Sequence, residues 1–200
     1  MMIDEGYIKF NPVWTQTEPL PWDRLENLNY WRDVMYEHQF IGAYDNGIGF
    51  GNISLRWEDT DQFVISGSAT GNFPKLNGQH YSLVTDVDIA KNTLHCQGPI
   101  VASSESMSHA VIYQECPWVN AVIHVHHLEY WQKLLHKLPT TPESVSYGSP
   151  EMAQSIVKLL RETNLQNGKL FVMAGHEEGL FAFGETLSAA AAILLELGHQ

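Results

Sequence analysis

The sequence has few cysteines, few basic residues and no long apolar run. Its two cysteines, Cys96 and Cys116, lack CxxC spacing, which excludes a disulfide-rich scaffold and favours a reducing, cytoplasmic location. Eleven basic against 23 acidic residues give a net charge of -12, which argues against a broad surface for nucleic acid or an anionic membrane. No run approaches the ~20 apolar residues that span a bilayer, and no basic N-terminal region precedes an apolar core. We therefore expect a soluble protein without an export signal.

The sequence does contain enough apolar material for one core. Hydrophobic residues make up 44% of its 200 residues, which is ordinary for a globular domain. Pro12, Pro19 and Pro21 interrupt the N-terminal stretch, so residues 1–20 are expected to be an arm that lies on the body or on a neighbouring subunit. Residues 21–200 are expected to form a single domain, because no internal repeat or linker divides them.

Apolar periodicity predicts an alternation of helices and strands. Apolar residues recur every three or four positions from Trp22 to Met35 and predict a helix that ends near Gln39. Further helices are expected from Ser104 to Pro117, over 128–137, from Ser149 through Leu160, and from near Thr186. Strands are expected at 52–57, 62–67, within 83–94, before His126, and as a hairpin over 169–174 and 180–183.

The segment 120–127, NAVIHVHH, is the most informative part of the chain. Side chains alternate along a strand, so His124 and His126 share one face at its exit while His127 points to the other. A second predicted strand ends at His176, which would lie at the tip of the hairpin. Convergence of such histidines at the ends of strands predicts a metal site.

A further segment, Ser103-Ser104-Glu105 followed by His109, places a carboxylate and an imidazole four residues apart on a helix. Glu105 is a fourth candidate ligand, and the set suits zinc or another borderline divalent ion such as manganese, iron or cobalt. His109 fits either a partner of the site or a helix-face histidine bonded to backbone.

Two other metal folds with a similar motif fit less well. A cupin needs a glutamate three or four residues beyond His-x-His, where this chain has Tyr130 and Trp131. A hydrolase of the HxHxDH type fails because position 128 is Leu128 and no Asp-His follows. A three-histidine site that activates a water stays chemically possible.

From about Asp23 to Leu197 the chain resembles the class II aldolase/adducin family. The resemblance is carried by motifs in the family's order: Gly51-Asn52-Ile-Ser54, Ser66-Gly67, Ser103-Ser104-Glu105 with His109, His124-Val-His126, and His176. It implies an α/β fold of three layers, α/β/α, with a central, mainly antiparallel sheet. It also implies a homotetramer with the site at a subunit interface.

The resemblance implies roles for individual residues. The histidines His124, His126 and His176 would bind zinc, and Glu105 would act as the catalytic acid/base and also ligate the metal. A phosphate pocket would be formed by Asn52, Ser66, Gly67, Ser103 and Ser104. A helix N-terminus at Ser104, with hydroxyls and glycine-loop amides, can hold a dianion without lysine or arginine.

The expected activity is that of a zinc-dependent lyase: retro-aldol cleavage of a small ketose phosphate or related polyol through a metal-bound enediolate. A sugar-phosphate epimerase or dehydratase of the same family, a structural zinc protein and a non-catalytic, adducin-like assembly module are the alternatives. Two departures bear on this choice. The chain has Gly175-His176-Glu177 where the family commonly has Asn-His-Gly, and Ser144 where epimerases carry an aspartate. The pair Glu177-Glu178 is interpreted as a solvated hairpin tip.

Overall fold

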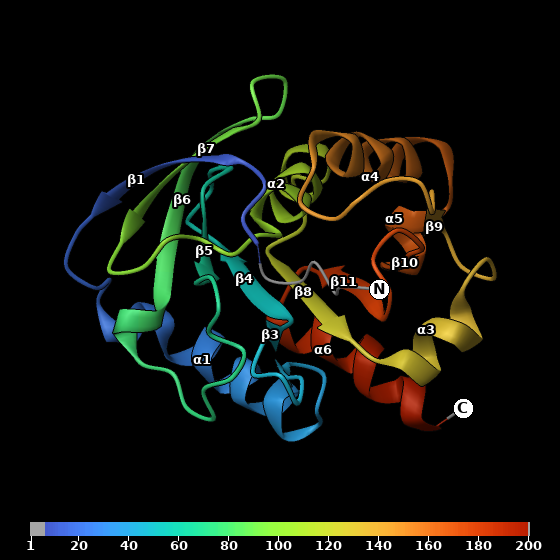
Figure 1. Ribbon diagram of the computed structural model, residues 1–200, viewed down its shortest axis with the longest axis horizontal. Coiled ribbons are helices and arrows are strands. Elements are labelled where there is room, and N and C mark those ends of the chain that lie inside the picture. Colours follow the sequence, from blue (N-terminus) through green and yellow to red (C-terminus); the bar gives the residue numbers. More distant parts are fainter. Residues whose placement is uncertain (1–6, 200) are drawn as a thin grey trace.

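A nine-stranded sheet forms the centre of the molecule, in the order β1-β7-β6-β5-β4-β8-β11-β10-β9 (Figure 1). The computed structural model describes residues 7–199. The strands of this sheet are β1 (Asn11–Gln16), β4 (Asn52–Arg56), β5 (Phe63–Ser66), β6 (Tyr81–Asp88), β7 (Thr93–Gly98), β8 (Ala121–His126), β9 (Thr140–Thr141), β10 (Leu170–Met173) and β11 (Gly179–Gly184). Among the described strands, only the two outermost pairs, β1 with β7 and β9 with β10, are parallel. The predicted, mainly antiparallel α/β sheet is confirmed.

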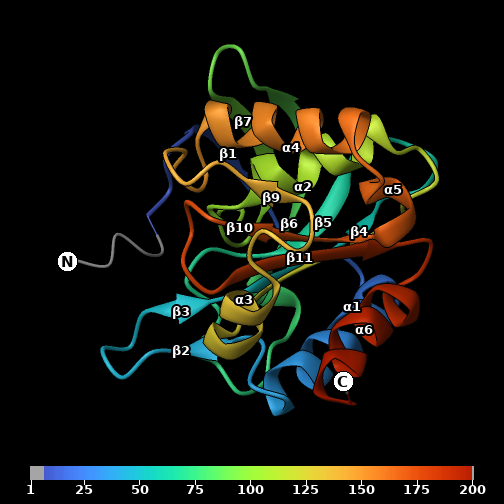
Figure 2. The ribbon, with the colours of Figure 1, turned by 90° about the vertical axis from the view of Figure 1, so that its right-hand side faces the viewer.

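Helices cover both faces of the sheet (Figure 2). They are α1 (Trp22–Glu37), α2 (Ser106–Glu115), α3 (Leu128–Leu134), α4 (Pro150–Glu162), α5 (Leu165–Gly168) and α6 (Leu187–Leu195), with 3-10 turns η1 (Gly78–His80) and η2 (Glu196–His199). One core cluster lies between the sheet and α2 with α4, and the other between the sheet and α1 with α6. A small ribbon of β2 (Gly42–Ala43) and β3 (Gly49–Phe50) stands beside the sheet. The three-layer arrangement is confirmed.

Local sequence signals explain where several elements begin. The apolar stripe of α1 consists of the residues that recur every three or four positions, and its members Leu25, Leu28 and Met35 are completely buried. The hydroxyl of Ser149 caps α4 by accepting from the backbone nitrogen of Met152, and Thr186 caps α6 in the same way. These helices and the β10–β11 hairpin lie where the periodicity predicts them.

Three predicted boundaries differ from the structure. Part of the N-terminal arm forms strand β1, which pairs with β7 at the sheet edge although all its residues are exposed. The segment 83–94 belongs to a long hairpin, β6 and β7, rather than to one strand and a turn. Helix α2 begins at Ser106 with Glu105 at its N-cap, so Ser104 lies in the preceding turn. Exposed strand residues give no alternation of apolar and polar side chains, which explains the omission of β1.

Two expectations from composition concern the cysteines and membrane-spanning helices. Cys96 and Cys116 are buried free thiols, too deep for exposed redox chemistry. Within residues 7–199, none of the helices has the length and apolar character that crossing a bilayer requires.

Candidate metal centre

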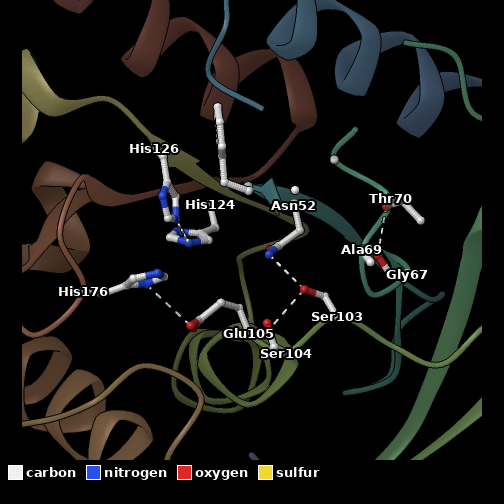
Figure 3. A pocket seen from close by; sticks show the side chains of 14 residues that line it. Asn52, Gly67, Ala69, Thr70, Ser103, Ser104, Glu105, His124, His126 and His176 are labelled. Atoms are coloured by element: carbon white, nitrogen blue, oxygen red, sulfur yellow. Dashed lines mark hydrogen bonds and ion pairs between the residues drawn. The ribbon is translucent and has the colours of Figure 1, made fainter. Parts of the chain in front are cut away.

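Three histidines converge at one end of the central sheet (Figure 3). His124 and His126 lie on one face of β8, and His176 comes from the turn between β10 and β11. One nitrogen from each ring lies within 4.8 Å of the others, and all three side chains are buried. The predicted convergence of the three histidines is confirmed.

The ring hydrogens of the two strand histidines point away from the centre. Nδ1 of His124 lies 3.1 Å from the carbonyl oxygen of Leu180 and donates to it. Nδ1 of His126 lies 2.8 Å from the hydroxyl of Tyr44, which itself donates to Oε2 of Glu178 at 2.9 Å. Because that hydroxyl hydrogen is used, Nδ1 of His126 must donate to the tyrosine oxygen. Both Nε2 atoms are therefore unprotonated.

Two bare Nε2 atoms 3.1 Å apart form a site that fits a cation. Their lone pairs repel each other when nothing lies between them. A zinc–nitrogen bond is about 2.0–2.1 Å, so two nitrogens on one ion lie at most about 4.2 Å apart. The separation of the His124 and His126 nitrogens falls within that limit, and the hydrogen bonds on Nδ1 are the usual support of a metal-binding histidine. These two residues thus fit a divalent metal ion, and His176 lies close enough to be a third candidate ligand.

Burial keeps these rings in the neutral form that binds metals. Loss of solvation lowers the pKa of His124 well below its usual range, and the neighbouring imidazoles of His126 and His176 lower it further. The pKa of His126 is lowered well below its usual range by the same burial and by His176. An ion that enters this site therefore does not have to displace protons from these two rings.

Glu105 approaches the triad from the start of α2 (Figure 3). Its side chain is buried, Oε2 accepts a hydrogen bond from Ser108 at 2.7 Å, and Oε1 lies 3.6 Å from Nδ1 of His176. The compact group of possible ligand atoms contains only the three histidines within the described part of the chain. Glu105 thus lies beside the triad, and its predicted role as a fourth ligand stays a prediction.

A polar pocket opens next to the histidines. It is lined by Gly49, Phe50, Gly51, Asn52, Gly67, Ala69, Thr70, Gly71, Ser103, Ser104, Glu105, His124, His126 and His176. Four of the five residues predicted to hold phosphate are in this lining. The fifth, Ser66, is not: its hydroxyl accepts from the backbone nitrogen of Ile53 at 3.3 Å. Ser66 therefore supports the sheet.

A glycine brings the two halves of the site together. Gly51 lies between β3 and β4 with a φ of +74°, a conformation that side chains other than glycine rarely adopt. A Cβ there would lie 2.8 Å from a side-chain carbon of Ile41 and 3.1 Å from the carbonyl oxygen of His124. The close approach predicted for this glycine segment is confirmed, and it places Asn52 opposite His124 in the sheet register.

Sequence reasoning missed the residues that support the site from neighbouring loops. Glu178 is half-buried and bonded to Tyr44, so only Glu177 fits the predicted solvated tip. Phe50 stacks on His126 and Tyr147 on His176, at centroid distances of 5.4 and 4.6 Å. These contacts join segments far apart in the chain, and no local pattern marks them.

Arg32 was also missed, although the sequence carries a signal for it. The side chain is 1% exposed and donates to the carbonyl oxygens of Thr70, Phe73 and Pro74 in the loop that lines the pocket. It lies four residues after Leu28, inside the apolar stripe of α1. A charged residue on a buried helix face needs a buried partner, and here it holds the pocket loop in place.

Comparisons with known proteins agree with this architecture. The family model described as "Class II Aldolase and Adducin N-terminal domain" matches residues 44–199. No curated protein matches the sequence. Among solved structures, L-fuculose 1-phosphate aldolase superposes with a TM-score of 0.68 at 20% identity, covering 90% of this chain and 84% of its own.

Two further solved structures show the same fold. YgbL of Escherichia coli, a candidate aldolase/epimerase/decarboxylase, has a TM-score of 0.63 at 20% identity, with 89% of this chain and 86% of its own covered. A sugar-phosphate aldolase from Thermotoga maritima has a TM-score of 0.60 at 16% identity, with 88% and 95% covered. Since the family model spans most of the sequence, this chain belongs to the class II aldolase and adducin N-terminal domain family.

Proposed function

We propose that the protein is a metal-dependent lyase that cleaves a small ketose phosphate, or a related polyol, by a retro-aldol reaction. The observation that carries the proposal is the buried triad of His124, His126 and His176 with Glu105 beside it, in the lining of a polar pocket. A structural descendant without catalysis has little physical need for a desolvated cluster of this kind next to a pocket. Zinc is the ion that this ligand set suits best, with manganese, iron and cobalt as alternatives.

When bound at the triad, a divalent ion supplies Lewis acidity to the carbonyl and adjacent hydroxyl oxygens of the substrate. Glu105 carries the proton. Its carboxylate takes the proton from the hydroxyl on the carbon that becomes the aldehyde, the carbon–carbon bond breaks, and the proton returns to the carbon that keeps the electron pair. Ser108 holds Oε2 at 2.7 Å, so Oε1, which faces His176, is the oxygen directed toward the centre.

The remainder of the pocket would bind the phosphate. Asn52, Gly67, Ser103 and Ser104 supply neutral donors, and no lysine or arginine occurs among the described lining residues. Hydrogen bonds from hydroxyl and amide groups can hold a dianion in a concave loop site without a cationic side chain. The buried Arg32 adds positive charge behind the loop without reaching the pocket. A homotetramer, typical of the family, is part of the proposal, and its mass in solution tests it.

Glu105→Gln tests the catalytic assignment. The parent protein and the variant are assayed on ketose phosphates and on the matching unphosphorylated ketoses, with product analysis that separates cleavage, epimerisation and dehydration. We expect aldehyde release by the parent and a loss of at least about 100-fold in kcat for the variant. Glu177→Gln, the same change at an exposed carboxylate, is the matched control and should keep parental activity.

Three results would contradict the proposal. Turnover by Glu105→Gln at the parental rate would remove the carboxylate from the chemistry. Epimerised or dehydrated product in place of aldehyde would assign one of the alternative activities of the family. Metal retained in elemental analysis, with no turnover of any ketose phosphate by the parent, would favour a structural metal or an assembly module.

A further inference from the structure

We propose that a buried hydrogen-bond relay behind the pocket fixes the Ser103 hydroxyl as a donor into the pocket, and that His109 is the positioning residue that sets its direction. The relay consists of Tyr113, Ser54, His109, Asn52 and Ser103. Its ligand is an oxyanion; the choice of phosphate as that oxyanion rests on the proposed function. His109 does not line the pocket and has no exposed surface, so it acts only through its neighbours.

The relay is continuous and dry. The Tyr113 and Ser54 hydroxyls are 2.7 Å apart, and Ser54 lies 2.7 Å from Nδ1 of His109. On the other side of the ring, Nε2 of His109 lies 2.6 Å from Oδ1 of Asn52, whose Nδ2 donates to Ser103 at 2.9 Å. Every side chain in the relay is buried. Hydrogen bonds shielded from water in this way are stronger than exposed ones, because the local dielectric constant is low.

The direction of each bond follows from the amide of Asn52 (Figure 3). Since Nδ2 donates to Ser103, Oδ1 must accept, and Nε2 of His109 must carry a hydrogen. Burial lowers the pKa of His109 to about 3, so the ring is neutral and has only that one hydrogen. Nδ1 therefore accepts from the hydroxyl of Ser54, and Ser54 in turn accepts from Tyr113.

At the pocket end of the relay, these bonds leave the Ser103 hydroxyl as a hydrogen-bond donor. The hydroxyl oxygen of Ser103 accepts from Nδ2 of Asn52 and, at 3.4 Å, from the backbone nitrogen of Glu105. A hydroxyl oxygen has two acceptor positions, and both are occupied, so its hydrogen remains to donate. Ser103 lines the pocket, where an oxygen of a bound anion can accept this hydrogen.

The opposite direction would give the pocket the wrong polarity. With hydrogen on Nδ1 of His109, the amide of Asn52 would turn over and Ser103 would donate to Oδ1. The serine oxygen would then face the pocket as an acceptor and would repel an oxyanion. The tautomer of one histidine outside the pocket thus decides between a donor and an acceptor at its wall.

A pair of substitutions tests the relay. His109→Gln supplies an amide NH₂ that can donate to Asn52 in place of the imidazole. His109→Phe fills the space with another aromatic ring but has no donor. Binding of inorganic phosphate is titrated by calorimetry on the metal-loaded proteins, and KM and kcat are measured on any ketose phosphate that the parent cleaves. We expect phosphate affinity to fall about tenfold in the phenylalanine variant, with the loss in KM, and to stay within about threefold of the parent in the glutamine variant.

Nitrogen-15 NMR of histidine-labelled parent protein reads the tautomer directly and does not depend on either variant folding. Hydrogen on Nε2 of His109 supports the relay, and hydrogen on Nδ1 overturns it. Unchanged phosphate affinity in a folded His109→Phe protein also overturns it. If the parent binds no phosphate but His109 is the Nε2–H tautomer, the relay is supported and the phosphate assignment of the proposed function fails.

Discussion

Replacing Tyr44 with phenylalanine removes one oxygen atom from the support of the metal centre. That oxygen lies 2.8 Å from Nδ1 of His126 and 2.9 Å from Oε2 of Glu178. Phenylalanine preserves the ring contact with Phe50, whose centroid is 4.8 Å away. Loss of such an outer hydrogen bond typically weakens metal binding 10- to 100-fold, or about 1.4 to 2.7 kcal/mol.

The structure favours the lower end of that range. Tyr44, Phe50, His126 and Glu178 also line an open groove, so a water molecule can replace the missing hydroxyl. We therefore expect zinc affinity, measured by competition with a chromophoric chelator, to fall about tenfold. Tyr130→Phe, the same change at a tyrosine that stacks on His127, is the matched control. Equal affinity in Tyr44→Phe and parent would refute the assignment of Tyr44 as a support of His126.

Three further predictions concern stability and substrate binding. Burial lowers the pKa of His109 to about 3, so as the pH falls the unfolded chain takes up the proton before the folded protein does. The free energy of unfolding should therefore be highest above about pH 6.5 and fall by up to about 1.4 kcal/mol per pH unit below it. Denaturant titrations measure this slope, which His109→Phe should reduce. Ser149→Ala removes the N-cap of α4 and should cost about 1 kcal/mol in the free energy of unfolding, whereas no change would show that the cap contributes nothing. Arg32→Met leaves the carbonyl groups of the pocket loop without their donor and should raise KM about tenfold or more, with a smaller effect on kcat; a selective loss in kcat would contradict this.

The sequence predicts those parts of the fold that depend on local pattern. Helix α1 follows from its apolar spacing, and α4 from the cap residues Ser149 and Pro150. Strand β1 could not be predicted in this way, because all its residues are exposed and its pairing partner β7 lies about 80 positions later in the chain. A strand of this kind is defined by its neighbour.

At the candidate site, too, local pattern predicts some residues, whereas others are brought together only by the folded structure. Alternation along β8 predicts that His124 and His126 share a face, and the end of a second strand predicts His176. The contact between Tyr44 and Glu178 joins residues 134 positions apart, and only the packed fold brings them together. The Ser66-Gly67 motif predicts both residues at the pocket, whereas only Gly67 is in its lining and the Ser66 hydroxyl accepts a hydrogen bond from the neighbouring strand. A motif identifies a segment, and the backbone decides which of its side chains reach the cavity.

The three histidines differ in how firmly their backbones are held. β8 is hydrogen-bonded to β4 on one side and β11 on the other, so two of the rings stand on a rigid wall. His176 stands on a turn, where its backbone is hydrogen-bonded to Met173 and Gly179 rather than to two flanking strands. A larger or smaller ion would therefore be accommodated by movement of the turn, while the wall keeps its spacing. We expect the turn, rather than the strand, to set the range of ionic radii that the three histidines accept.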